Sequence, residues 1–151
     1  MENTPIGTCV VFLSLTGNSR RFAEFAAKVV DAEVVSFWEV KKDLFCKNLL
    51  IVSGVYLLSN LWWLPKLSKL KCENLATCSL FSIAKNVAQR AESLFKTFVD
   101  HKNYYGHYIE VGYFPLFYWT KSKPYPQDYS RFKLWLENFK LFCERQNRIS
   151  Q

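Results

Sequence analysis

The chain has 151 residues, of which 50% are hydrophobic and 22% are charged, and its formal net charge is +7. This length is enough for one core without disulfides or metals, and the composition excludes a disordered chain, so we expect a single domain spanning residues 1–151. The basic balance indicates an acidic partner surface or contact with a membrane or nucleic acid, although a solvated basic surface also explains it.

The five cysteines are scattered through the sequence and form no C-x-x-C pair. This pattern predicts buried free thiols in a reducing compartment rather than a disulfide framework or a zinc site. The first residues, MENTPIG, lack the basic and apolar regions of a signal peptide, so we expect a cytoplasmic protein. The apolar run 49–64 is shorter than a membrane span and polar residues interrupt it, which favours a buried strand and its following loop.

Residues 9–30 read as a strand, a hydroxyl-rich turn and the start of a helix. The strand covers residues 9–13 and the turn covers residues 14–19. The helix that follows carries Phe22, Phe25, Ala26 and Val29 on one face at the spacing of a half-buried helix. Hydroxyls and the free N–H groups of a helix start converge here, so this turn is predicted to favour an anion.

The middle of the chain continues the alternation of strands and helices. Residues 32–37 are predicted to form a second strand, and residues 38–47 a loop with about one helical turn. The apolar run 48–53 indicates a strand buried on both faces at the centre of a parallel sheet. An aromatic loop over residues 54–63 and a short helix over residues 61–70 are expected next.

The last part of the chain is predicted to add two strands and two helices. Strands are expected over residues 75–83 and 108–114, separated by a helix from Ala84 to Val99, with Phe98 on its apolar face, and a turn over residues 100–106. His101 and His107 flank the Tyr104–Tyr105 pair near this turn and are expected to be surface or packing residues. Irregular structure follows over residues 115–127, then a helix over residues 128–143 and a fraying tail.

The turn after the first strand resembles the phosphate loop of the flavodoxins, [ST]-x-T-G-x-[ST], whose defined positions are filled by Ser14, Thr16, Gly17 and Ser19. The resemblance implies an α/β flavodoxin-like three-layer sandwich, with a five-stranded parallel sheet in the order 2-1-3-4-5 and helices on both faces. It also implies that FMN is the cofactor. The residues implied for its phosphate are Ser14, Leu15, Thr16, Gly17, Asn18 and Ser19.

In this fold, ligands bind at the carboxyl ends of the strands, where the strand order reverses. The resemblance therefore implies that two further loops face the flavin ring. The loop after the central strand contributes Gly54, Val55, Tyr56 and Trp62, and the loop after the fourth strand contributes Ser82, Ile83 and Ala84. The second loop departs from typical flavodoxins, because it has no Gly or acidic residue.

The resemblance implies an FMN-binding electron-transfer protein, serving a redox partner with an acidic surface. A flavin-dependent oxidoreductase of the protoporphyrinogen oxidase type is one alternative, because residues 81–90 are similar to that branch and a basic aromatic loop offers peripheral membrane contact. Residues 16–22 are also similar to flavodoxins that activate ribonucleotide reductase. A basic binding scaffold without flavin is a further alternative, but a nucleic-acid partner is disfavoured because most aromatics fall at core spacing. No separate catalytic motif stands out, so any enzyme would work through the flavin.

Overall fold

The computed structural model describes residues 6–13, 18–40, 42–54, 64–81, 85–111 and 129–149. Its centre is one five-stranded sheet in the order β2-β1-β3-β4-β5, in which every pairing is parallel. This is the predicted strand order. The strands are β1 (Ile6–Leu13), β2 (Glu33–Ser36), β3 (Leu44–Gly54), β4 (Leu70–Phe81) and β5 (Asn103–Val111).

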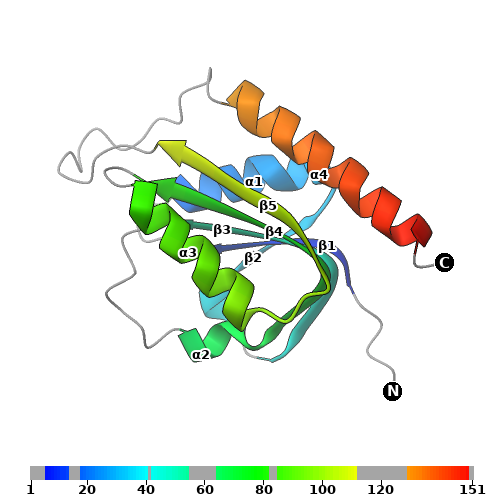
Figure 1. Ribbon diagram of the computed structural model, residues 1–151, viewed down its shortest axis with the longest axis horizontal. Coiled ribbons are helices and arrows are strands. Elements are labelled where there is room, and N and C mark those ends of the chain that lie inside the picture. The colour runs from blue at the N-terminus through cyan, green and yellow to red at the C-terminus, as the bar shows by residue number, and fades with distance from the viewer. Residues whose placement is uncertain are drawn as a thin grey trace.

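Helices cover both faces of the sheet, which gives the expected three layers (Figure 1). One face is covered by α1 (Asn18–Val30) and α4 (Tyr129–Ile149). The other face is covered by the short 3-10 helix η1 (Phe37–Glu39), α2 (Leu64–Leu67) and α3 (Lys85–Phe98). The alternation of strands and helices along the sequence produces this arrangement, because each parallel crossover places its helix on a face of the sheet.

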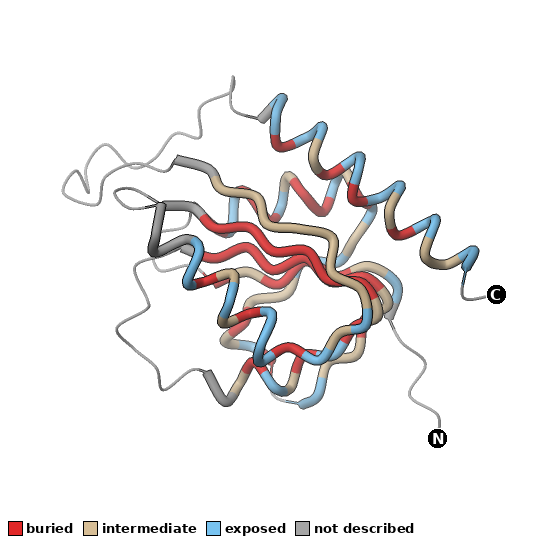
Figure 2. Tube along the Cα trace, viewed as in Figure 1, coloured by how far each residue is buried: buried red, intermediate tan, exposed pale blue. Residues whose placement is uncertain are grey.

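The central strand β3 is buried on both sides, as its continuous apolar sequence predicts. Leu49 and Ile51 pack in the core under α3, whereas Leu50 and Val52 pack in the core under α1 and α4. All four side chains are fully buried, and Figure 2 shows the buried stretches concentrated in the middle strands. Burial of apolar side chains on both faces is the main stabilising contribution to this sheet.

Aromatic side chains join α4 to the rest of its layer. The ring of Phe132 lies 5.4 Å from that of Phe22 on α1 and 5.0 Å from that of Tyr108 on β5, between ring centroids. These tilted contacts are the favoured geometry for aromatic pairs. Because Phe132 is fully buried, its aromatic area holds the last helix against both the first helix and the edge strand.

Helix α1 ends where Asp31 adopts a left-handed conformation, with a φ of 54°. The N–H of Ala32 donates to the carbonyl oxygen of Ala27 at 2.9 Å, which closes the last turn of the helix. Glycine usually occupies such a position, since it has no side chain to oppose a positive φ. Asp31 therefore sets the end of α1 at a cost in backbone strain.

Four strands begin earlier than the sequence pattern predicts. β1 begins at Ile6 rather than residue 9, β3 at Leu44 rather than residue 48, β4 at Leu70 rather than residue 75, and β5 at Asn103 rather than residue 108. The expected turn over residues 100–106 is therefore wrong from Asn103 onward. The early parts of β4 and β5 carry polar side chains such as Glu73, Asn74 and Asn103, which the hydrophobic pattern left outside the strands. Sheet pairing and side-chain hydrogen bonds accommodate those polar residues inside the fold.

The helices also differ from the prediction in their bounds. The final helix runs to Ile149, so the expected fraying tail after Cys143 is wrong. The short second helix is limited to Leu64–Leu67 within the described residues, and Leu70 already belongs to β4. Phe98 was expected on the apolar face of α3, but it is 38% exposed, whereas Ala91, Phe95 and Val99 are buried there.

Candidate functional site

The predicted ligand site lies where β1, β3 and β4 end and α1 begins. Figure 1 shows the strand arrowheads directed toward one edge of the sheet, at which α1 also starts. Three predicted site residues are described: Asn18 and Ser19 open α1, and Gly54 ends β3. The others lie outside the described residues, so their roles stay predictions: Ser14, Leu15, Thr16, Gly17, Val55, Tyr56, Trp62, Ser82, Ile83 and Ala84.

Ser19 is a buried hydroxyl in the first turn of α1. Its side chain is fully buried, and its Oγ has no hydrogen-bond partner among the residues that the structure describes. The first turn of α1 carries no acidic side chain. The N–H groups of a helix start are free to donate, and the helix dipole makes their surroundings positive. An unpartnered hydroxyl at such a point fits a phosphate group.

Arg20 and Arg21 follow Ser19 in the sequence, but Arg20 points toward solvent. Its Nε donates to Glu24 Oε1 at 3.1 Å, and both side chains are more than half exposed. Exposed pairs of this spacing stabilise a helix by only about 0.3–0.5 kcal/mol. Arg20 therefore lies in solvent on the first turn of α1.

Two more buried hydroxyls lie near the carboxyl ends of neighbouring strands. Ser53 on β3 and Ser79 on β4 are partners in the sheet register, and both face the side of the sheet that α3 covers. Both are buried, and neither Oγ has a partner within the described ranges. Native proteins rarely leave such groups unsatisfied, so these hydroxyls point to a ligand or ordered water at this edge. Neither serine was among the predicted site residues, although a serine inside an apolar strand was the available signal.

A connected polar network lies on the same face of the sheet, further from the carboxyl edge. The Thr77 hydroxyl on β4 is 2.7 Å from His107 Nδ1 and 2.9 Å from the Tyr104 hydroxyl, both on β5. Tyr104 in turn donates to Glu92 Oε2 on α3 at 2.6 Å. The expectation that His107 flanks a turn is wrong, because it lies inside β5.

Burial changes the proton affinity of this network. It lowers the pKa of His107, since the interior disfavours the imidazolium, and the charge of Glu92 opposes this only in part. It also raises the pKa of Tyr104, and the hydrogen bond to Glu92 adds to that increase. Both groups are thereby held in their neutral forms.

The opposite end of the sheet carries a row of amides on the other face. Asn48 donates to Thr8 Oγ1 at 3.1 Å, Asn74 donates to Asn48 Oδ1 at 2.8 Å, and Asn103 donates to Asn74 Oδ1 at 3.0 Å. We call Thr8, Asn48, Asn74 and Asn103 the asparagine row. It crosses β1, β3, β4 and β5 without interruption, and the side-chain amides of Asn48 and Asn74 find hydrogen-bond partners within the row.

Two hollows formed by described residues lie on the α1 and α4 side of the molecule, away from the predicted crevice. One is a cavity of about 150 Å³ between the sheet and α4, lined in part by Thr8, Asn48 and Cys143. The other is an open groove of about 640 Å³ between α1 and α4. Neither contains a residue of the predicted flavin site.

The cysteines match the prediction of thiols outside disulfides, since all five are buried and none forms a disulfide. Burial raises the pKa of Cys72 and of Cys143 to about 12, so both stay protonated at neutral pH. In the described ranges, no three His, Cys, Asp or Glu side chains gather as a metal site would need. Among the described helices, none combines the length and apolar character needed to cross a membrane.

Comparison with known proteins identifies the fold. No protein-family model matches the sequence, and no curated protein sequence matches it. Solved structures do match. A flavodoxin from the domain Archaea is 14% identical, covers 92% of this chain and 99% of its own, and has a TM-score of 0.59. Oxidised flavodoxin 2 from Bacillus cereus is 12% identical over 93% and 99% of the two chains, with a TM-score of 0.61. Diflavin flavoprotein A3 from Nostoc sp. is 12% identical over 99% and 100%, with a TM-score of 0.62. The fold of this chain is flavodoxin-like.

Proposed function

We propose that this flavodoxin-like domain binds FMN at the carboxyl edge of its sheet and transfers electrons. The observation that carries the proposal is the buried, unpartnered hydroxyl of Ser19 in the first turn of α1. This residue is the last defined position of the phosphate-loop motif, and it lies at a helix start that favours an anion. The general rule that open α/β sheets bind ligands at the carboxyl ends of their strands supports the same edge.

Each part of the site has a distinct task in this proposal. Ser19 and the first N–H groups of α1 hold the phosphate, together with the turn of residues 14–17. The loops that follow β3 and β4, which begin after Gly54 and Phe81, carry the residues predicted to contact the flavin ring. The bound FMN supplies the redox chemistry, because no amino-acid side chain of this site accepts and returns electrons reversibly.

The charge distribution supports a redox partner with an acidic surface. Helices α1 and α4 together carry eight basic and three acidic side chains on one side of the molecule. A basic surface speeds encounter with an acidic partner and weakens as the ionic strength rises. We expect the association rate with the physiological partner to fall at high salt.

The test of cofactor binding is the visible absorption spectrum after excess FMN is added and free FMN is removed. The wild-type protein is expected to retain a two-band flavin spectrum. Ser19→Ala is expected to weaken FMN binding about 10-fold to 100-fold, because a hydrogen bond to a charged group contributes about 1.5–3 kcal/mol. The matched control is Ser93→Ala, which changes an exposed serine on α3 and should leave the affinity unchanged.

A folded wild-type protein that stays colourless would overturn the redox function while leaving the fold intact. The basic binding scaffold would then be the function to pursue, with salt-dependent binding to acidic partners as its measurement. Retention of FMN with equal affinity in Ser19→Ala and wild type would instead show that the phosphate binds elsewhere.

A further inference from the structure

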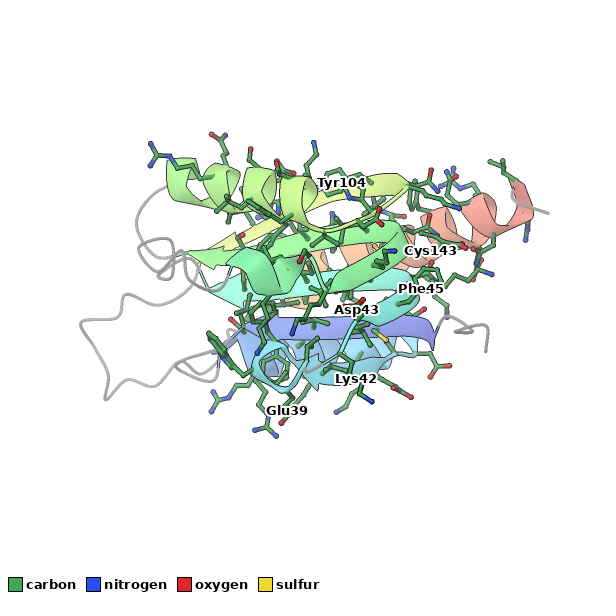
Figure 3. All side chains as sticks on the ribbon, turned by 90° about the horizontal axis from the view of Figure 1, so that it is seen from below. Glu39, Lys42, Asp43, Phe45, Tyr104 and Cys143 are labelled. Atoms are coloured by element: carbon green, nitrogen blue, oxygen red, sulfur yellow. The ribbon has the colours of Figure 1, made fainter. Side chains whose placement is uncertain are left out.

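Four polar side chains form a continuous chain of hydrogen bonds from the surface of α3 into the sheet. They are Glu92 on α3, Tyr104 and His107 on β5, and Thr77 on β4, joined by contacts of 2.6, 2.9 and 2.7 Å. Figure 3 labels Tyr104 beside α3. Thr77 is fully buried and Glu92 is partly exposed, so the chain joins the interior to solvent.

The chemistry of the four groups fixes the direction of every hydrogen bond. The Glu92 carboxylate has no proton to give, so Tyr104 must donate to it. Each hydroxyl has one proton, so the Tyr104 oxygen accepts from Thr77. The Thr77 proton is then already used, so the Thr77 oxygen accepts from His107 Nδ1–H. Neutral His107 therefore carries its proton on Nδ1 and a free lone pair on Nε2.

The Nε2 atom of His107 is the inner end of this chain. It is buried and has no partner among the described residues. The next buried hydroxyls on the same face toward the carboxyl edge are Ser79, two residues beyond Thr77, and its register partner Ser53. Polar groups therefore continue from His107 toward the edge where the cofactor is proposed to bind.

We propose that Glu92, Tyr104, Thr77 and His107 form a proton wire between solvent and the cofactor crevice. The inference rests on the proposed function, since the wire serves the proton uptake and release that accompany reduction and oxidation of the flavin. These four side chains are not among the residues proposed to bind the phosphate or the ring of FMN, so the wire gives them a role.

The proton transfers along the wire balance. When Nε2 takes up a proton from the crevice, the Nδ1 proton moves to Thr77, the Thr77 proton moves to Tyr104, and the Tyr104 proton moves to Glu92. His107 is then neutral with its proton on Nε2, Glu92 is a carboxylic acid, and every hydrogen bond has reversed its direction. The reverse sequence delivers one proton to the crevice and restores the Glu92 carboxylate.

The charged and titratable groups around the wire are few in the described part of the chain. On α3, Glu92 accepts from Tyr104, and Lys96 Nζ lies 4.7 Å from the centroid of the Tyr104 ring. On the other side, the His101 ring lies 6.0 Å from the same ring, and its Nδ1 is 2.8 Å from the Val99 carbonyl oxygen. His101 therefore neighbours the wire without being one of its links.

The first test uses the protein without FMN. Nitrogen NMR of the histidine rings is expected to show His107 neutral at pH 7, with the proton on Nδ1 and a free Nε2. Thr77→Val removes the acceptor and should shift His107 toward the Nε2–H form, whereas His101→Gln should leave its spectrum unchanged and assigns the signals. A wild-type His107 with its proton on Nε2 would overturn the wire.

The second test uses the FMN-loaded protein and measures the rate of cofactor reduction by stopped flow, in H₂O and in D₂O. Tyr104→Phe and Glu92→Gln are each expected to slow proton-coupled reduction at least 10-fold while changing FMN affinity less than 2-fold. The matched control is Tyr105→Phe, because the Tyr105 hydroxyl contacts the Trp135 carbonyl oxygen at 3.4 Å on the opposite face.

The outcomes separate this inference from the proposed function. If FMN is retained but Tyr104→Phe and Glu92→Gln react as fast as Tyr105→Phe, the wire is wrong and the flavin function stands. If FMN is not retained, both are overturned, even where the NMR spectrum shows the expected form of His107. Slow reduction in both wire variants, with a solvent isotope effect that they alter, supports the wire.

Discussion

The two ends of the sheet treat buried polar side chains in opposite ways. At the amino end, on the α1 and α4 face, the asparagine row satisfies its central amides through three hydrogen bonds across four strands. At the carboxyl end, the hydroxyls of Ser19, Ser53 and Ser79 are buried without partners in the described structure. Buried polar groups that are fully bonded serve stability, whereas those left unbonded are expected where a ligand or water completes them.

This contrast separates buried polar side chains that stabilise the fold from those expected to bind a ligand, and it needs no sequence motif. The central amides of the asparagine row find their hydrogen-bond partners within the described residues, so removing a member of the row should cost stability. The buried hydroxyls at the carboxyl end have no hydrogen-bond partners in the described structure. Removing one of them should therefore change the unfolding free energy little until a ligand binds. Substitutions at the two ends therefore have different expected effects on the unfolding free energy.

The largest effect is expected from Asn74→Ala, at the buried centre of the asparagine row. The substitution leaves Asn48 Oδ1 and Asn103 Nδ2 without their partners, and each unsatisfied buried group costs about 1–3 kcal/mol. We expect the unfolding free energy to fall by about 3 kcal/mol in urea denaturation. Asn138→Ala, on the exposed side of α4, is the control and should change it by less than 1 kcal/mol. A loss below 1 kcal/mol for Asn74→Ala would remove the distinction between the two ends.

The next effect concerns pH and the partly satisfied His107. Because burial places its pKa in the folded state below the unfolded value of 6.5, the unfolded chain binds more protons in that window. Stability contributed by neutral His107 is therefore complete above pH 6.5 and is lost as the pH falls toward the lower, folded pKa. The slope cannot exceed about 1.4 kcal/mol per pH unit for one proton. His107→Gln should flatten the profile of unfolding free energy against pH below pH 6.5, and the control His101→Gln should leave the contribution of His107 in place.

A smaller effect of opposite sign is expected at the carboxyl end. Ser79→Ala removes a buried hydroxyl that has no described partner, so the protein without FMN should gain between 0 and about 1 kcal/mol in unfolding free energy. Thermal and urea unfolding of the FMN-free protein measure this gain. A loss of more than 1 kcal/mol would show that the Ser79 hydroxyl has a hydrogen-bond partner in solution. It would then stabilise the fold, as the asparagine row does.

The smallest effect is expected from Thr8→Val, at the outer end of the asparagine row. Thr8 accepts from Asn48, but it is partly exposed and lines the cavity of about 150 Å³, so water can replace its hydroxyl. We expect a loss of about 0.5 kcal/mol, measured under the same conditions as Asn74→Ala. If Thr8→Val lowers the unfolding free energy as much as Asn74→Ala does, the end of the row contributes as much stability as its centre.

The sequence predicted the fold through its strongest periodic signals. The apolar runs at residues 9–13 and 48–53 marked two central strands, and the spacing of Phe22 and Ala26 marked the buried face of α1. The strand order followed from the flavodoxin resemblance and is confirmed. These signals are reliable because burial of a strand or a helix face imposes a period that few loops share.

The asparagine row and the wire were missed for a common reason. Asn48 marked the start of a predicted strand, and Asn103 was assigned to a turn, since asparagine is frequent in turns. His107 was assigned beside that turn, although a register shift between Leu75 and Ala76 lets β5 continue through this region. Cross-strand hydrogen bonds join residues 26–40 positions apart, which a pattern along the chain cannot reveal. The site residues of the loops stay predictions, and only Asn18, Ser19 and Gly54 are placed at the carboxyl edge.

The asparagine row also has a consequence for how the chain folds. Every strand pair here is parallel, so no pair forms through a short hairpin, and bonded partners in the row are 40, 26 and 29 positions apart. A slip of one residue in the pairing of β3 with β4 would turn every side chain of the slipped strand to the opposite face. Such a slip would break the amide contacts together and bury unpaired amides in the core under α3. The row therefore penalises misaligned intermediates, and it makes the correct alignment the one from which folding proceeds to completion.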